Sequence, residues 1–375
     1  MQNAKPDVKA RLELRSNAAT DRPPGRRTRV SGARSSDSGS RPGLTKAPVD
    51  QALIVIPCLN EAAIIANVIA QILNDDGLES PLVVVADGGS TDGSQDIVRR
   101  LAASDDRVKL LANPKRLQSA GVNLAAFDAP PGTTWLIRVD AHADYPPNYA
   151  STLIAEARRT GATSVVVGMD TQGSAAFQRA VATAQNSRLG AGGSAHRNGG
   201  GAAWVEHGHH ALFSLAAFQA VGGYDESFSH NEDAELDFRL LSGGGRIWLT
   251  DRAQIVYYPR RTPLALSRQY FSYGKGRART VQKHHTRLKF RQALPLTVAP
   301  AVLLAAAAPW AWPLALPALA WAGLSLAYGL VLGVRRRDAF SSASGVAAMI
   351  MHLAWSAGFW AQLLRGPQSA AAAVN

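Results

Sequence analysis

The segment ALIVIPCLNE (residues 52–61) decides how the rest of the chain is interpreted. Its first five residues form an apolar run of strand length, and the polar residues Asn60 and Glu61 close it. A second such run, LVVVADGGSTDGS (82–94), comes after a periodic, helix-like segment at 61–73. Apolar strands that alternate with helices are typical of βαβ units, whose sheet is buried on both faces. The sequence therefore predicts an α/β sandwich.

Further apolar runs of strand length lie at residues 108–111, 135–139 and 164–167. Polar, turn-forming residues follow three of the runs, at 57–61, 87–94 and 140–144. Ligands gather beyond the carboxyl ends of the strands in sheets of this kind. These three segments are therefore the ones expected to build a functional site.

The composition allows several kinds of partner. The chain has 375 residues, 46% of them hydrophobic, which is enough for a sizeable core. Its formal net charge of +12 favours a polyanionic partner, whether nucleic acid, anionic lipid or a phosphorylated substrate. Cys58 is the only cysteine, which excludes an internal disulfide, and we interpret it as a small buried hydrophobe.

The N-terminal part differs sharply from the rest. Residues 1–48 are rich in Arg, Ser, Gly and Pro, which predicts a disordered basic arm, either attached to anionic lipid headgroups or simply solvated. No apolar run long enough for a secretory signal precedes residue 52, so the catalytic part is expected on the cytoplasmic side. Residues 49–292 are predicted to form that catalytic domain, and 367–375 a short tail.

Residues 293–366 are predicted to form a membrane region of two or three hydrophobic helices. The stretch 294–334 is almost uncharged and long enough for a helical hairpin, with two spans of about 20 residues each. Basic residues at 287–291 and 335–337 flank it, which places both of its ends in the cytoplasm. Residues 345–364 are a weaker third span, or a helix that lies in the membrane interface. The alternative is that all of these helices are buried in a soluble protein.

Three polar clusters carry the candidate chemistry. Asp87 precedes a glycine turn, which suits either a plain strand-to-helix connection or a nucleotide site. Asp140, His142 and Asp144 combine hard oxygen ligands with an imidazole, a set that suits Mn²⁺ or Mg²⁺. The segment HNEDAELD (230–237) gathers carboxylates at a predicted helix start. The helix dipole favours them there, and a carboxylate beside other carboxylates is suited to general-base work.

The order of these motifs resembles family 2 glycosyltransferases of the GT-A fold. The matching segments are PCLNE (57–61), DGGSTDGS (87–94), NP (113–114), GVN (121–123), RVDAHADYP (138–146) and NEDAEL (231–236). Within that family, residues 138–146, VEHGHH (205–210) and YGKGR (273–277) are most similar to succinoglycan-biosynthesis glucosyltransferases of the ExoA type. The expected fold is therefore a Rossmann-like GT-A domain with a mixed, mostly parallel sheet, followed by C-terminal transmembrane helices.

The resemblance also implies an activity. Such an enzyme transfers a hexose, here expected to be glucose, from a UDP-sugar to a lipid-linked saccharide acceptor in exopolysaccharide synthesis. It inverts the anomeric configuration, depends on a divalent cation (Mn²⁺ or Mg²⁺) and works at the cytoplasmic face of the inner membrane. No nucleic-acid partner is expected.

Residue roles follow from the same resemblance. Asp233 would be the catalytic base, beside the substrate-binding Glu232, and Asp140 and His142 would hold the metal and the diphosphate. Asp87 would face the uracil edge. The nucleotide site would consist of residues from the first two motifs: Pro57, Asn60, Glu61, Asp87, Gly89 and Ser90. The candidate phosphate partners, which solvated surface charges would equally explain, are Lys115, Arg116, Lys275 and Arg277.

Two departures from the family pattern affect these roles. His142 stands at the second acid position of the Asp-x-Asp motif, so Asp144 is a possible replacement ligand. QYFSY (269–273) stands where processive synthases carry Gln-x-x-Arg-Trp, which predicts the addition of a single sugar.

Two further segments allow more than one interpretation, and two other functions are compatible with parts of the sequence. The glycine-rich segment 190–201 is either a lid or acceptor loop or a passive linker. His207, His209 and His210 are interpreted as a polar strand near the acceptor, because their spacing does not suit a zinc site. One alternative function is a nucleic-acid or anionic-membrane binding protein, against which the acidic strand ends argue. The other is an inactive glycosyltransferase-like scaffold.

Overall fold

A computed structural model describes residues 51–192, 201–288 and 290–366, all of which belong to one compact unit. The predicted basic arm, most of the glycine-rich segment and the predicted tail lie outside these described residues.

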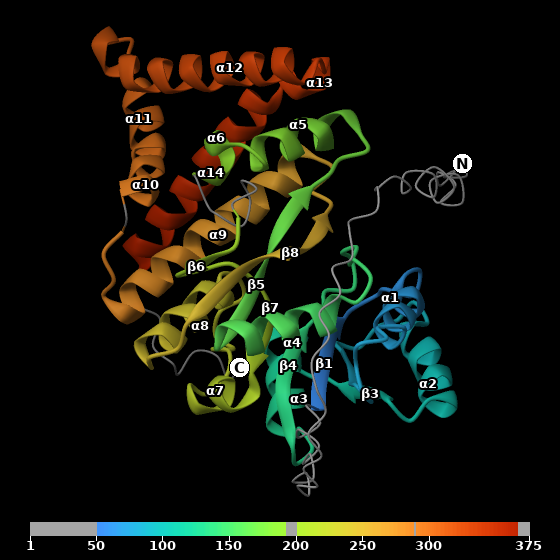
Figure 1. Cartoon of the computed structure of the whole chain (residues 1–375). Helices are drawn as coiled ribbons and strands as arrows, with labels where there is room; N and C mark the ends of the chain where they lie inside the picture. Colours follow the sequence, from blue (N-terminus) through green and yellow to red (C-terminus); the bar gives the residue numbers. More distant parts are fainter. Residues whose placement is uncertain (1–50, 193–200, 289, 367–375) are drawn as a thin grey trace, which may run out of the picture. The chain divides into compact units, whose positions relative to one another are not determined.

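An eight-stranded mixed sheet runs through this unit in the order β3-β2-β1-β4-β7-β5-β8-β6 (Figure 1). The pairs β2–β3, β1–β2, β1–β4 and β5–β8 are parallel, whereas β7 runs antiparallel to β4 and β5, and β6 antiparallel to β8. The strands are β1 (Gln51–Cys58), β2 (Leu82–Asp87), β3 (Val108–Ala112), β4 (Thr133–Arg138), β5 (Ser164–Thr171), β6 (Ala203–Val205), β7 (His209–Ser214) and β8 (Ile247–Tyr257).

Helices bury both faces of the sheet, and β1 shows why its sequence is uniformly apolar. Ile54, Ile56 and Cys58 pack with α1, α2 and α4 on one face, while Leu53 and Val55 pack with α3, α7 and α8 on the other. The covering helices are α1 (Ile65–Leu73), α2 (Ser94–Ser104), α3 (Gln118–Phe127), α4 (Tyr149–Thr160), α7 (Leu215–Ala220) and α8 (Glu232–Ser242). Cys58 is buried as predicted, and burial together with Asp87 raises the pKa of its thiol to about 11.

The predicted strands are confirmed, but β6 and β8 are additional strands, and the first helix begins later than expected. β8 was not predicted, because the polar stretch at 250–254 interrupts its apolar pattern where the strand is shifted in register against β5. The first helix begins at Ile65 and not at residue 61. The preceding residues are held in a turn, since Glu61 N–H donates to Ser94 Oγ and Ala62 N–H donates to Asp92 Oδ2 (both 2.9 Å).

The C-terminal segment does not form the predicted hairpin of two equal spans within 294–334. Prolines, which lack an N–H and break helices, divide its first half into short pieces. α12 and α14 are the long helices, and the expected weaker span is α14. The elements of this segment are α10 (Phe290–Ala293), η4 (Leu294–Thr297), α11 (Val298–Ala305), η5 (Trp312–Ala315), α12 (Leu316–Arg336), α13 (Ala339–Ser342) and α14 (Ser344–Arg365). They are accompanied by three earlier helices, α5 (Ala176–Gln185), α6 (Arg188–Ala191) and α9 (Pro263–His284).

Among the residues that the structure describes, two segments are long and apolar enough to cross a membrane, Trp312–Arg336 and Ala339–Arg365. They differ in how far the protein itself covers them. Only 11% of the apolar window of the first is buried, compared with 44% of the second. The α12 segment therefore presents its apolar side chains outward, whereas α14 is in part a core helix.

α14 packs lengthwise against α9 (Figure 1). Glycines allow the two backbones to touch. A Cβ atom on Gly274 of α9 would overlap the carbonyl oxygen of Trp355, and one on Gly358 of α14 would overlap that of Phe271. The C-terminal helices are therefore joined to the sheet domain by direct backbone packing, and the predicted boundary at residue 292 falls inside this packed unit.

The turn between α12 and α14 is anchored as well. Arg179 of α5 forms an ion pair with Asp338 (2.7 Å), and Thr183 Oγ1 lies 2.9 Å from Ser341 Oγ. At the far end of α14, Gln362 Nε2 donates to Gln282 Oε1 of α9 (3.3 Å). Both ends of α14 are thus held against helices of the sheet domain.

Candidate active site

Asp87 organises the turn that follows β2. Its Oδ2 accepts hydrogen bonds from Gly89 N–H (2.8 Å), Ser90 N–H (2.9 Å) and Gln95 Nε2 (2.7 Å), and its Oδ1 accepts one from the Ser90 hydroxyl. A carboxylate offers about four lone-pair sites, so Oδ1 keeps one for a ligand. The main work of Asp87 in this structure is therefore to shape the turn, with one acceptor position left over.

Asn60 and Arg116 border this turn, and both have left-handed backbone conformations, with φ of 60° and 56°. Asn adopts this region readily, whereas a long side chain rarely does, so its surroundings impose the conformation of Arg116. A Cβ placed on Gly89 would lie 3.5 Å from Arg116 Nη2, which puts the guanidinium over the turn. Pro57 pairs with Ala86 inside the sheet and shapes the end of β1.

Arg138, the last residue of β4, gathers the acids of two motifs. Its side chain is 4% exposed, and its Nε lies 3.2 Å from Asp140 Oδ1. Its Nη1 lies 3.1 Å from Asp233 Oδ1 and 3.7 Å from Glu232 Oε1, while Nη2 donates to Gln118 Oε1 (2.7 Å). A buried guanidinium requires such partners. The end of β4 and the start of α8 are thereby fixed to each other.

The two neighbouring acids of α8 lie at different distances from Arg138, and Glu232 is the more strongly affected by burial. Burial, with the nearby charge of Asp233, raises the pKa of Glu232 to about 8, because Arg138 compensates only part of this effect. The Arg138 guanidinium lies closer to Asp233 than to Glu232. At neutral pH, Glu232 is therefore expected to keep its proton, as happens where two carboxyl groups share one site.

Glu232 also makes stability depend on pH. The ordinary pKa of a glutamate, 4.5, applies to Glu232 in the unfolded chain, whereas in the folded protein its pKa is about 8. At pH values between these two, the folded protein therefore holds a proton that the unfolded chain has lost. The free energy of unfolding should thus fall as pH rises, by up to about 1.4 kcal/mol per pH unit. Glu232→Gln imitates the protonated form and should lose this slope. Thermal unfolding of both proteins at about pH 5.5, 7 and 8.5 measures it, and equal slopes would contradict the assignment.

Asp140 and His142 are the candidate cation ligands. Burial raises the pKa of Asp140, but the charge of Arg138 and the contact with His209 outweigh burial and hold this pKa well below its usual range. His142 is half exposed, with Nδ1 3.6 Å from Glu61 Oε1. Residues 51–192, 201–288 and 290–366 contain no group of three or more His, Cys, Asp or Glu side chains that could hold a metal ion. The donors fit a cation whose other ligands are diphosphate oxygens and water, as is usual for Mg²⁺.

Asp144, the possible replacement ligand, is engaged elsewhere. Its Oδ2 accepts a hydrogen bond from the Tyr258 hydroxyl (2.7 Å), and its backbone forms a β-bridge with Val256. The structure does not bring it together with Asp140 at the cavity described next.

A cavity of about 880 Å³ lies over the Arg138 cluster. Lys115 does not reach it, because its Nζ is paired with Glu226 Oε2 (2.6 Å). The predicted site residues that line the cavity are Arg116, Asp140, His142, Glu232, Asp233 and Arg277. Those that form the strand ends and turn beyond it are Pro57, Asn60, Glu61, Asp87, Gly89 and Ser90.

Two histidines of the segment predicted to be a polar strand near the acceptor line the cavity, and so does Gln118, which was not predicted. His207 lies against the buried Asp237, with 2.7 Å between Nδ1 and Oδ2, and His209 Nε2 lies 3.6 Å from Asp140 Oδ2. The segment that contains both histidines was interpreted only as a polar strand, and β7 begins at His209. Gln118, which binds Arg138, carries no signal in the sequence that would have found it.

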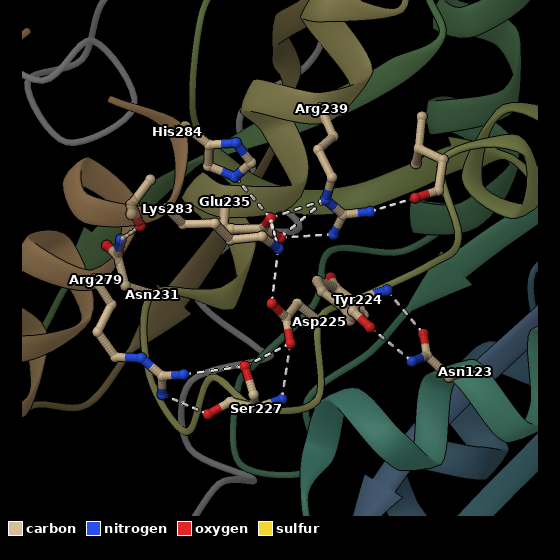
Figure 2. A network of polar contacts seen from close by, with 12 residues as sticks. Asn123, Tyr224, Asp225, Ser227, Asn231, Glu235, Arg239, Arg279, Lys283 and His284 are labelled. Atoms are coloured by element: carbon tan, nitrogen blue, oxygen red, sulfur yellow. Dashed lines mark hydrogen bonds and ion pairs between the residues drawn. The ribbon is translucent and has the colours of Figure 1, made fainter. Parts of the chain in front are cut away.

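A second buried carboxylate, Glu235, ties α8 to its surroundings (Figure 2). Its side chain is fully buried and accepts from Lys283 Nζ (2.6 Å), His284 Nε2 (2.9 Å) and the guanidinium of Arg239 (2.6 Å to Nη2). Lys283 also binds Asp225 Oδ2 (2.7 Å). Because Lys283 and His284 end α9, this network holds α8 and its catalytic candidates against that helix.

The loop between α7 and α8, which contains Asp225, connects this network to Arg138. Tyr224, next to Asp225, lies within 3.4 Å of the Arg138 guanidinium through its hydroxyl. Its backbone N–H donates to Asn123 Oδ1 of α3 (2.8 Å), and Asn123 Nδ2 donates back to the Tyr224 carbonyl (2.9 Å), as Figure 2 shows. The position of the acids therefore depends on α3, α8 and α9 together.

Comparisons with known proteins agree with this architecture. Residues 53–222 match the model of the family Glycosyl transferase family 2. The chain is 53% identical over 312 residues to the succinoglycan biosynthesis protein ExoA of Rhizobium meliloti, which covers 83% of this chain and 94% of that protein. It is 35% identical over 100 residues to the glycosyltransferase AglD of Haloferax volcanii, or 25% of this chain and 16% of that one.

A solved structure shows the same fold. It is the mannosyltransferase PcManGT from Pyrobaculum calidifontis in complex with GDP-Man and Mn²⁺, with a TM-score of 0.51 and 20% identity. The match covers 84% of this chain and 88% of that one.

Proposed function

Because the chain belongs to glycosyltransferase family 2, we propose that it transfers a single hexose from a UDP-sugar to a lipid-linked saccharide, with inversion. Glucose is the first candidate sugar, and exopolysaccharide synthesis of the succinoglycan type is the proposed process. The observation that carries the proposal is the shared guanidinium of Arg138, which sets the donor-side Asp140 and the base Asp233 around one cavity.

The proposed reaction is one displacement. Asp233, ionised beside Arg138, takes the proton from an acceptor hydroxyl, and that oxygen attacks the anomeric carbon. The bond from this carbon to the diphosphate oxygen breaks on the opposite face, so UDP leaves and an α-linked donor gives a β-linked product. Glu232, which keeps its proton at neutral pH, donates a hydrogen bond to a substrate oxygen.

The donor would lie between the Asp87 turn and Asp140. The free acceptor position on Asp87 suits the uracil N–H, and Arg116 is placed over the turn for the diphosphate. Asp140 and His142 would hold a divalent cation, which would neutralise charge on the leaving UDP.

A membrane is the proposed environment. Leu303, Leu324 and Val334 of α11 and α12 are between 73% and 77% exposed, and apolar surface of this extent requires cover by lipid or protein. The triple arginine at 335–337 follows this surface, as expected for a segment next to anionic headgroups. We place the protein at the inner membrane with its catalytic domain on the cytoplasmic side.

UDP release from the purified, detergent-solubilised protein tests the proposal. UDP-sugars and GDP-mannose are offered with a lipid-linked acceptor extract, in Mn²⁺, Mg²⁺ or EDTA. We expect release from one UDP-sugar and its loss in EDTA. Release from GDP-mannose alone would overturn the UDP assignment, and release that is unchanged in EDTA would overturn the cation. Failure to bind UDP or to release it would favour the inactive-scaffold alternative.

A further inference from the structure

His207 lies in the cavity with the proposed base, and a buried carboxylate holds its imidazole ring. Asp237 comes one helical turn after Asp233 on α8, so the two acids lie on the same side of this helix. The side chain of Asp237 is 3% exposed, and its Oδ2 lies 2.7 Å from His207 Nδ1. The side chain of His207 is 43% exposed and lines the cavity together with Asp233. A substrate in this cavity can therefore reach the ring.

The backbone that carries His207 is fixed as well. Gly208 is buried, and its N–H donates a hydrogen bond to the carboxylate of Asp237. A Cβ placed on Gly208 would overlap the side chain of Val166 in β5, so the chain is pressed against the sheet at this point. β7 begins at the next residue, His209. The imidazole is thus held both through its backbone and through Nδ1, as a binding group that is ordered before the substrate arrives must be.

The chemistry of the pair suits more than a link between α8 and β7. Burial raises the pKa of Asp237, and the contacts with His207 and with Gly208 oppose this effect. A buried carboxylate is unfavourable, and a neutral side chain could join two elements at a lower cost in free energy. What a carboxylate adds is control of the ring, because it accepts from Nδ1–H and so makes Nε2 the acceptor atom of the neutral imidazole. An acceptor of this kind suits the proton of a sugar hydroxyl.

We propose that His207 binds the acceptor sugar, with Nε2 accepting a hydrogen bond from a second hydroxyl while Asp233 takes the proton of the first. Asp237 acts through His207 and is a positioning residue. The contact is assigned to the acceptor because Asp237 shares a helix turn with the base. The residues proposed for the donor, Asp87 and Arg116, belong instead to the turn after β2 and its border. The inference rests on the proposed function, since it names a specificity contact of that reaction.

His207→Asn separates substrate binding from structure. The amide nitrogen of asparagine takes the place of Nδ1 and can still donate to Asp237, but nothing replaces Nε2. We expect the KM for the lipid-linked acceptor extract to rise about ten-fold, because the contact is lost before and during the reaction alike. The turnover number and the KM for the UDP-sugar should stay within about two-fold of the wild type. Steady-state UDP release, with extract and UDP-sugar varied in turn, measures these constants.

Asp237→Asn tests the positioning role. It should raise the same KM about three-fold or more, because the amide no longer fixes which ring nitrogen carries the proton. The double variant with His207→Asn should lose no more than His207→Asn alone, since Asp237 acts only through the ring. His285→Asn is the matched control. It makes the same change at an exposed residue that does not line the cavity, so its constants should equal those of the wild type.

Each other outcome contradicts a definite part of the inference. Wild-type constants in His207→Asn would mean that the imidazole only joins two elements, and would overturn it. A rise in the KM for the UDP-sugar would move the contact to the donor, and an equal rise in His285→Asn would remove its specificity. Additive losses in the double variant would contradict the positioning role of Asp237. If the wild type itself released no UDP, the proposed function would fail and the inference would fall with it.

Discussion

Asp233→Asn is expected to lower the turnover number for sugar transfer by about 10³-fold, because the amide cannot accept the proton of the acceptor hydroxyl. Asparagine keeps the size of the side chain and a carbonyl oxygen for Arg138, so the cavity should keep its shape. UDP affinity should therefore stay close to that of the wild type. Single-turnover transfer from the UDP-sugar found in the release assay measures the effect.

Asp96→Asn is the matched control, since it makes the same chemical change in an exposed ion pair of α2 with Arg99. Its turnover should equal that of the wild type. If Asp233→Asn kept more than about a tenth of wild-type turnover, Asp233 would not be the base. A normal rate for Asp233→Asn together with a large loss in Glu232→Gln would move that role to the neighbouring residue.

Gly358→Leu should lower the free energy of unfolding by more than about 3 kcal/mol, because its side chain has no room between α14 and α9. The Cβ alone would overlap the carbonyl oxygen of Phe271, so the two helices must separate. Thermal unfolding in detergent measures the loss. Gly358→Ala, with a smaller side chain, gives a second value if the leucine variant yields no folded protein.

Gly323→Leu provides the control within the same apolar region. Nothing lies within 4 Å of a Cβ placed at this α12 position, so its melting temperature should stay at the wild-type value. Equal losses at Gly323 and Gly358 would point to a general effect of added bulk in apolar helices, and an unchanged Gly358→Leu protein would contradict the packing of α14 on α9.

The parts of the fold visible in the sequence are those in which local pattern and burial agree. β1 and β2 are apolar on both faces, so their runs stand out, and the turns after them follow from position. β8 is not visible in the sequence, because polar residues interrupt its apolar pattern at the point where its register against β5 shifts. The predicted hairpin fails because proline spacing, and not total apolar length, decides where helices end.

The site was partly predictable for a similar reason. The acids of α8 share one local pattern, yet Glu232 and Asp233 face the cavity, Glu235 faces α9, and Asp237 faces His207. That division depends on how the helix is rotated against its neighbours. Lys115 was predicted as a phosphate partner but is paired with Glu226. This pairing could not be predicted, because Glu226 lies 111 residues away and no short motif links the two residues.

The anchoring of α14 also bears on which side of a membrane the chain after residue 366 is expected to lie. A helix that carries the chain across a bilayer must separate its ends by about 30 Å of hydrocarbon. Both ends of α14 are instead bonded to the enzyme, through Ser341 just before it and Gln362 near its end. Although α14 is long enough to cross, we therefore expect it to stay on one side of the bilayer. A reporter fused after residue 366 should therefore share the compartment in which the sugar is transferred.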